Sequence, residues 1–150
     1  MNREIKFRGK MIPENEWIFR TILRIPAPPV CFGKSETDKY YIQFPDPRYM
    51  PDWNMPYKMV QGEVNADTIG QYTGLDDKNG KEIYEGDVVY CQTKYGKAKA
   101  IIKFIDGKFA AYWNSALTHP ENGHHIACYE INKRFEVIGN IYDNPELLGG

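Results

Sequence analysis

The chain has 150 residues and a formal net charge of −1, a length that fits one domain or two small ones sharing a core. Hydrophobic residues make up 42% of it and charged residues 26%, which excludes disorder throughout, and the near-neutral charge excludes a strong overall field for nucleic acid or membranes. The high aromatic content of 14% favours β structure.

Cellular location follows from the cysteines and from the apolar runs. Cys31, Cys91 and Cys128 are widely spaced and odd in number, which is not typical of a disulfide framework. No apolar run reaches the ~18 residues that span a bilayer, and the first eight residues lack the apolar stretch of a signal peptide. The expected location is a reducing cytoplasm.

The N-terminal part, residues 1–74, is predicted to contain strands and a long loop. Residues 4–8 alternate with Ile5 and Phe7 on a buried face, and β-branched residues favour a second strand over 17–25. Seven of the ten prolines lie within 26–56, so this stretch is predicted to be an aromatic, proline-rich loop that contains one short strand at 40–44.

The C-terminal part, residues 75–150, has a more regular strand pattern. Asn65 is predicted to cap one helical turn before it, and Asn79-Gly80 predicts a tight turn. Asp106-Gly107 is typical of a two-residue hairpin turn, and the stretch from Asn144 predicts a terminal helical turn. The expected strands cover residues 83–92, 97–105, 108–114, 125–131 and 135–142.

About five short strands joined by tight turns predict a small barrel over residues 75–142, because closure removes exposed strand edges. The fold class is therefore mainly β. The N-terminal strands and the proline-rich loop are expected to pack beside this barrel in one compact unit.

Three segments resemble the YopX family of phage and prophage proteins. Residues 69–75 (IGQYTGL) and 77–89 (DKNGKEIYEGDVV) resemble its central signature. The opening (residues 3–10, with Glu16-Trp17) and the close (residues 138–148) are similar to the family's two ends. Much of 25–57 lies outside the resemblance.

The resemblance implies coiled β-sheets with a C-terminal SH3-like barrel and an origin in a phage or an integrated prophage. It implies no activity, because the family is uncharacterised. It therefore assigns no catalytic residues to this sequence.

The side chains that could carry catalysis or bind metal do not form a convincing set. His119, His124, His125 and Cys128 are one loose group, whereas zinc sites use ligands paired at short spacing. A catalytic Cys–His pair would also need an orienting partner and an oxyanion site. A buried thiol on a strand is the preferred interpretation, and we expect neither an enzyme nor a cofactor.

One binding hypothesis concerns nucleic acid. Lys97, Lys99 and Lys103 would project from one face of a single strand, with Tyr95 and Trp113 near them. A basic face with aromatic rings is how many small barrels bind phosphates and stack bases. The alternative is that these lysines only keep an exposed strand soluble.

The other binding hypothesis, which the sequence favours, is a protein partner or self-association. Tyr49, Trp53 and Tyr57 lie in the proline-rich loop, and aromatic side chains dominate interface energetics. The alternative is that the loop packs over its own domain. The expected function is thus a non-enzymatic accessory protein that binds a macromolecule.

Overall fold

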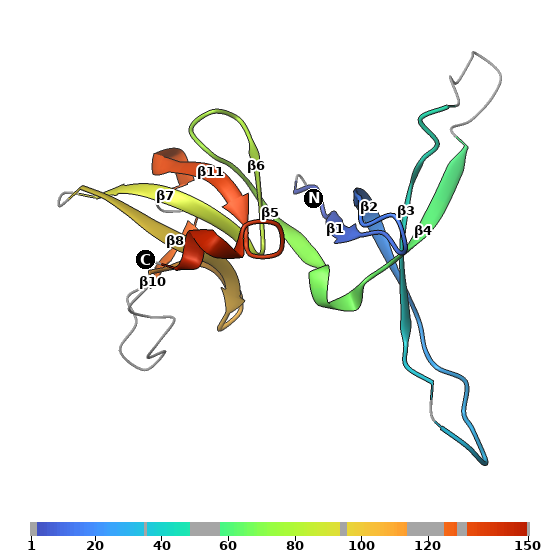
Figure 1. Cartoon of the computed structure of the whole chain (residues 1–150). Coiled ribbons are helices and arrows are strands. Elements are labelled where there is room, and N and C mark those ends of the chain that lie inside the picture. Colours follow the sequence, from blue (N-terminus) through green and yellow to red (C-terminus); the bar gives the residue numbers. More distant parts are fainter. Residues whose placement is uncertain are drawn as a thin grey trace. The chain divides into compact units, whose positions relative to one another are not determined.

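The computed structural model describes residues 3–34, 36–48, 58–93, 96–113, 125–128 and 132–149, and its regular structure is mainly β (Figure 1). The strands pair in two antiparallel sheets. The predicted class is therefore confirmed. In the part of the chain that the structure describes, no helix is long and apolar enough to cross a membrane.

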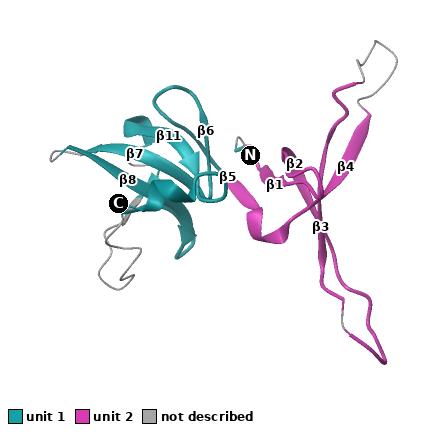
Figure 2. Cartoon of the chain, in the orientation of Figure 1, with its two compact units in different colours: residues 1–3, 72–150 teal, residues 4–71 magenta. Residues whose placement is uncertain are grey.

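The chain divides into two compact units, one formed by residues 4–71 and the other by residues 1–3 and 72–150 (Figure 2). Strand β5 (Gly70–Asp76) passes from one to the other. Its first two residues, Gly70 and Gln71, pair with β1, whereas Tyr72 and Asp76 pair with β6.

In the first unit four strands pair in the order β4-β3-β2-β1. Buried Ile18, Ile42 and Val64 form a small core on one face of this sheet. A short 3-10 helix, η1 (Ala66–Thr68), follows the sheet, and the Asn65 side chain accepts a hydrogen bond from the Asp67 N–H at 3.0 Å, which confirms the predicted cap. The strands are β1 (Phe7–Lys10), β2 (Trp17–Ile25), β3 (Lys39–Pro45) and β4 (Met59–Val64).

The prediction for the first strand was wrong in its bounds and its buried face. β1 begins at Phe7 rather than at residue 4, and Ile5 is 49% exposed. Arg8, expected on the solvent side, is only 7% exposed. Its guanidinium lies 4.8 Å from the centre of the Trp17 ring, and this cation–π contact compensates a charge that is largely removed from water.

Strand β4 was not predicted, and Gly62 is the reason. Glycine lowers strand propensity, so the sequence pattern around it is weak. In the structure a Cβ at this position would lie 2.6 Å from the Met11 Sδ and 3.1 Å from the Ile18 Cδ1. Gly62 therefore lets a neighbouring side chain approach the backbone of β4 closely.

The loop between β2 and β3 is closed at its base by Asp38. Its carboxylate accepts hydrogen bonds from the Ala27 backbone N–H at 3.0 Å and from the Arg24 Nε at 2.7 Å. Beyond this closure the described part of the proline-rich stretch exposes two apolar side chains, Val30 at 46% and Phe32 at 97%. The described side chains of this loop are not part of the core cluster of the unit.

In the second unit five strands pair in the order β10-β9-β8-β7-β11, and a short strand β6 pairs with β5. The predicted SH3-like barrel is not confirmed. Among the described residues neither sheet closes, because β10 and β11 form the two opposite edges of the five-stranded sheet. The strands are β6 (Glu82–Tyr84), β7 (Asp87–Thr93), β8 (Gly96–Ile105), β9 (Lys108–Trp113), β10 (His125–Ala127) and β11 (Phe135–Asn140).

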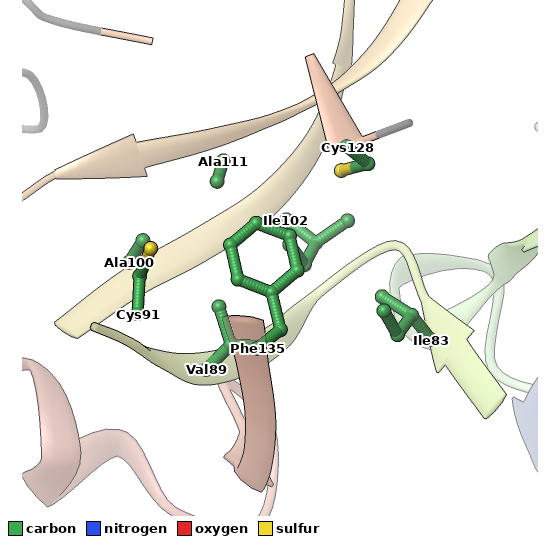
Figure 3. Close-up of a cluster of buried hydrophobic side chains, with 8 residues drawn as sticks. All are labelled: Ile83, Val89, Cys91, Ala100, Ile102, Ala111, Cys128 and Phe135. Carbon is green, nitrogen blue, oxygen red and sulfur yellow. The ribbon is translucent and has the colours of Figure 1, made fainter. Parts of the chain in front are cut away.

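One face of the five-stranded sheet carries the main core (Figure 3). Phe135 from β11 and Ile102 from β8 are fully buried in it, beside Ile83 from β6. The remaining members are small or β-branched side chains that fill the space between the strands: Val89, Cys91, Ala100, Ala111 and Cys128.

Two predicted turns of this unit are confirmed. Asp106 and Gly107 connect β8 to β9 with φ values of 51° and 76°, the positive values that a primed hairpin turn requires. The C-terminal stretch forms a 3-10 helix, η4 (Pro145–Leu148), with Asn144 at its N-cap position. β10 ends at Ala127, earlier than the strand predicted for 125–131.

Candidate functional site

The second face of the five-stranded sheet lies opposite the main core and is called the outer face here, although it also buries Ala110 and Tyr112 in a small cluster of its own. On β8, Ala100 and Ile102 point into the core, so strand alternation places Lys97, Lys99 and Lys103 on the outer face. The sheet register places Gln92 beside Lys97 and Tyr90 beside Lys99.

The aromatic residues predicted to accompany these lysines are not all on this face. Trp113 pairs with Ala100 across β8 and β9 and packs against the core, so it points away from the lysines. Tyr95 lies outside the described residues. Tyr90 is the ring that the register brings to the lysines instead.

The C-terminal segment separates the three lysines from one another. The Lys99 ammonium donates a hydrogen bond to the Leu147 carbonyl of η4 at 3.3 Å. Lys103 lines a small hollow of about 190 Å³ whose wall includes Tyr142. Lys97 lies six residues from Lys103, or about 20 Å along an extended strand. The lysines therefore do not form one continuous basic surface.

Lys97 instead lines a larger groove of about 580 Å³ at the other end of the sheet. A turn, three strands and a 3-10 helix contribute to it, so residues far apart in the sequence meet there. Lys78 comes from the turn after β5, and Lys133 and Arg134 come from η3 (Asn132–Arg134). The other lining residues are Tyr90 and Gln92 on β7 and Glu136 on β11.

The groove is strongly basic although the whole chain is not. Lys78, Lys97, Lys133 and Arg134 supply four positive charges and Glu136 one negative charge, which leaves a net charge of +3 at neutral pH. All four cationic residues are exposed. Within the described part of the chain, Lys133 and Arg134 form no ion pair, so their charges are available to a ligand.

Two contacts order the side chains along the groove. The Lys97 ammonium lies 5.7 Å from the centre of the Tyr90 ring, in cation–π range. The Lys78 ammonium forms an ion pair with the Glu136 carboxylate at 2.5 Å. The hydrogen bond from Lys78 and its charge, together with the charge of Lys97, hold the pKa of Glu136 below its usual value.

Asp77 fixes the turn that presents Lys78. It is 2% exposed, and its carboxylate accepts backbone hydrogen bonds from Asn79 at 2.8 Å, Lys81 at 3.0 Å and Val137 at 2.9 Å. Burial alone would raise the pKa of Asp77, but these three N–H donors outweigh it and hold the pKa below its usual value. The turn is thereby fastened to β11 on the groove wall.

Sequence reasoning missed three of the four cations in this groove. Lys78 adjoins the turn predicted at Asn79-Gly80 but received no role of its own, and neither did the adjacent pair Lys133 and Arg134. The pair is the signal that was present, since two consecutive cations between predicted strands must lie at one end of the sheet.

The residues of the predicted partner interface, Tyr49, Trp53 and Tyr57, lie outside the described residues, as do His119 and His124. The side chains described in the structure include no group of three His, Cys, Asp or Glu that could hold a metal ion. Cys128 is 1% exposed, and burial raises the pKa of its thiol to about 12, far from the range of a nucleophile at neutral pH.

Comparison with known proteins gives a family and a fold. The model of the family described as "YopX protein" matches residues 6–149. The crystal structure of protein EF1440 from Enterococcus faecalis is similar at 23% identity with a TM-score of 0.50, over 98% of this chain and 99% of that chain. No curated protein matches. At this identity the structural likeness concerns the fold alone.

Proposed function

This chain belongs to the YopX family, and we propose that it is a non-enzymatic phage or prophage accessory protein that binds single-stranded nucleic acid in the basic groove. The observation that carries the proposal is the set of four exposed cations around Tyr90. The site of action would be the cytoplasm of the bacterial host.

The charge of the groove supports a polyanionic ligand. Four cations converge from three separate parts of the chain, while the chain as a whole has a net charge of −1. A protein with an unremarkable overall charge attracts a phosphate backbone through such a local concentration of cations. The Lys78–Glu136 ion pair leaves Lys97, Lys133 and Arg134 as the main phosphate ligands.

The shape and the aromatic ring support a single strand rather than a duplex. The groove is concave and is formed by strand residues and short turns. Tyr90 lines the groove half-buried, and the Lys97 ammonium lies over its ring. An unpaired base that stacks on this ring would take the place of the ammonium, which could then contact the phosphate of the same nucleotide. Stacking of this kind tolerates any base, so the expected binding is independent of sequence.

The hypothesis of a protein partner at Tyr49, Trp53 and Tyr57 stays a prediction. These residues lie outside the described residues, so no contact or exposure supports a site there. The basic groove is therefore the better-supported basis for a function.

The test is the anisotropy of a fluorescently labelled oligonucleotide titrated with the full chain at several salt concentrations. Counterion release from a single strand gives a slope of log K against log salt of about −0.7 per phosphate contact, so contacts from Lys97, Lys133 and Arg134 predict a slope of about −2. Lys97→Glu and Lys133→Glu should each weaken binding and reduce this slope by about 0.7 or more. Tyr90→Ala should weaken binding without changing the slope.

Two lysines of the same unit provide matched controls. Lys108→Glu changes the charge by the same amount outside the groove, and Lys103→Glu does so in the separate hollow. Both should leave the affinity for the oligonucleotide within about twofold of the wild type because each lies outside the ligand's path. The proposal is overturned if the wild type does not bind at low salt, or if all four charge reversals weaken binding equally.

A further inference from the structure

Part of strand β2 has an unpaired edge. β1 pairs with β2 only along residues 17–20, whereas β3 pairs with residues 21–25 on the other side. Within the described residues, the second side of Thr21 to Ile25 has no strand partner. Alternate residues of an antiparallel strand direct their N–H and C=O groups to each side, so this segment presents free backbone donors and acceptors.

Both ends of this free edge are blocked. Arg20 is the last residue of β2 that pairs with β1, and it departs from ordinary strand geometry with a φ of 141°. Pro26 follows Ile25 and has no N–H to donate. Five residues are therefore available to an incoming strand, and their centre is Leu23.

The side chains beside this edge are unusually apolar for an exposed strand. Leu23 is 37% exposed and Ile25 is 49% exposed, and strand alternation places both on the same side of the sheet. Arg24 points to the opposite side, where it pairs with Asp38. Natural proteins usually protect a free edge with charged side chains or a bulge. On the side with Leu23 and Ile25 the charge is Lys39 of β3, opposite Ile25, and residues 21–25 of β2 carry none there.

These features fit a second copy of the same strand. An antiparallel pair that uses the whole edge brings Leu23 opposite Leu23 of the second copy, and Thr21 opposite Ile25 of the second copy. In this register Arg20 of one copy lies opposite Pro26 of the other. The residues that end the free edge in the two copies therefore end the paired segment at the same positions. Arg24 lies opposite Ile22 of the second copy, and no like charges face each other.

We propose that residues 21–25 of β2 pair with the same residues of a second copy about a two-fold axis at Leu23, which makes the protein a homodimer. This interface lies in the first unit and is independent of the proposed nucleic-acid groove in the second. Such an isologous contact needs no other surface, because each copy supplies the same backbone edge and the same apolar side chains. Five paired residues form a small interface, so the expected state is a concentration-dependent monomer–dimer equilibrium.

Sedimentation velocity of the full chain, from about 1 µM to about 1 mM, measures this equilibrium. Leu23→Lys places two ammonium groups opposite each other at the axis, and Ile25→Lys removes an apolar contact twice per dimer. Each substitution should raise the dissociation constant of the dimer by about tenfold or more. Met59→Lys is the matched control, because Met59 is 42% exposed in the same unit on β4, which β3 separates from β2. This variant should dimerise as the wild type does.

A cross-linking experiment tests the register separately. In a Cys31→Ser background, Leu23→Cys should form a disulfide-linked dimer on mild oxidation, since residues opposite each other at the axis lie within disulfide distance. Met59→Cys in the same background should remain unlinked, because β3 separates it from the free edge of β2. A wild type that stays monomeric at the highest concentration overturns the proposal, as does a dimer that survives both lysine substitutions in variants with wild-type circular dichroism.

Discussion

At the scale of single residues, buried polar groups organise this protein as much as its apolar core does. Asp77 links the turn of residues 78–80 to β11 through the Val137 N–H. Asp87 is also 2% exposed and accepts the Tyr84 N–H at 2.8 Å. In both cases a carboxylate satisfies backbone donors that the sheets leave unpaired, so its removal leaves buried N–H groups without an acceptor.

The first prediction concerns the stability that Asp77 contributes. Asp77→Ala removes the acceptor of three backbone N–H groups and should lower the free energy of unfolding by about 3 kcal/mol. Asp77→Asn keeps one side-chain oxygen as an acceptor, so it should lower the free energy of unfolding by less than Asp77→Ala does. Urea unfolding followed by circular dichroism at pH 7 measures both, and exposed Asp67→Ala is the control that should change little.

This contribution also depends on pH with a definite sign. The folded state holds the pKa of Asp77 below the unfolded value of about 3.8, so folding favours the ionised form. The stabilisation is fully present above the unfolded pKa and disappears as pH falls through the folded one. The difference in stability between the wild type and Asp77→Asn should therefore narrow below about pH 4; parallel curves down to pH 2 would contradict this.

Sequence periodicity places residues on strands, but it does not show which face is covered. Alternation correctly predicts that Lys97 and Ala100 lie on opposite faces of the sheet. It does not predict that the face with Trp113 is the one that packs against the core. Arg8 shows the same limit, since a cation–π contact with Trp17, which lies on another strand, helps to compensate its buried charge. These outcomes depend on pairing between distant strands, which no local pattern contains.

At the scale of elements, the hairpin turns were predictable and the closure of the sheet was not. Asp106-Gly107 predicts its turn because both residues tolerate positive φ. Barrel closure instead requires the first and last strands to pair, and β10 extends only over His125–Ala127. The basic groove was missed for a similar reason, because a turn, three strands and η3 build it together.

The second prediction concerns the C-terminal segment, which packs on Gly86. The Gly86 N–H donates to the Ile102 carbonyl, and its own carbonyl accepts from the Ile141 N–H, both at 2.9 Å. Gly86 has a φ of +86°, and a Cβ there would lie 3.0 Å from the Tyr142 Cε2. Gly86→Ala should thus combine backbone strain with a steric conflict against a ring.

Gly80 separates these two effects. Its φ of +80° is nearly the same, but a Cβ there would have nothing within 4 Å. Gly80→Ala should lower the free energy of unfolding by about 1–2 kcal/mol through backbone strain alone. Gly86→Ala should lower it by at least about 1 kcal/mol more, because of the conflict with Tyr142. Thermal unfolding of the two variants measures the difference, and equal losses would show that Tyr142 moves aside freely.

At the scale of the whole molecule, the two units differ in the size of their cores. Among the residues that the structure describes, the main cluster of the second unit buries eight side chains, including Phe135, whereas the cluster of the first unit buries three: Ile18, Ile42 and Val64. Because apolar burial is the main source of stability, the two units should not open with the same free energy.

The third prediction follows from this difference. In native-state hydrogen exchange, amides of β7, β8 and β9 should exchange most slowly, and amides of β2 and β3 should exchange earlier. The expectation applies to the monomer, so the measurement belongs at low protein concentration. One common exchange rate for both groups of strands would mean that the units unfold as a single cooperative body.

The closure of the β2–β3 loop by Asp38 has a consequence for how the gene can diverge. Because Ala27 and Arg24 are held at the loop's base, residues 28–37 can change in length or composition while the register of the two strands is kept. The entropic cost of a longer loop grows only slowly with its length. This segment is thus a position where natural variants of the protein can acquire insertions and new surface properties while the rest of the fold stays under selection.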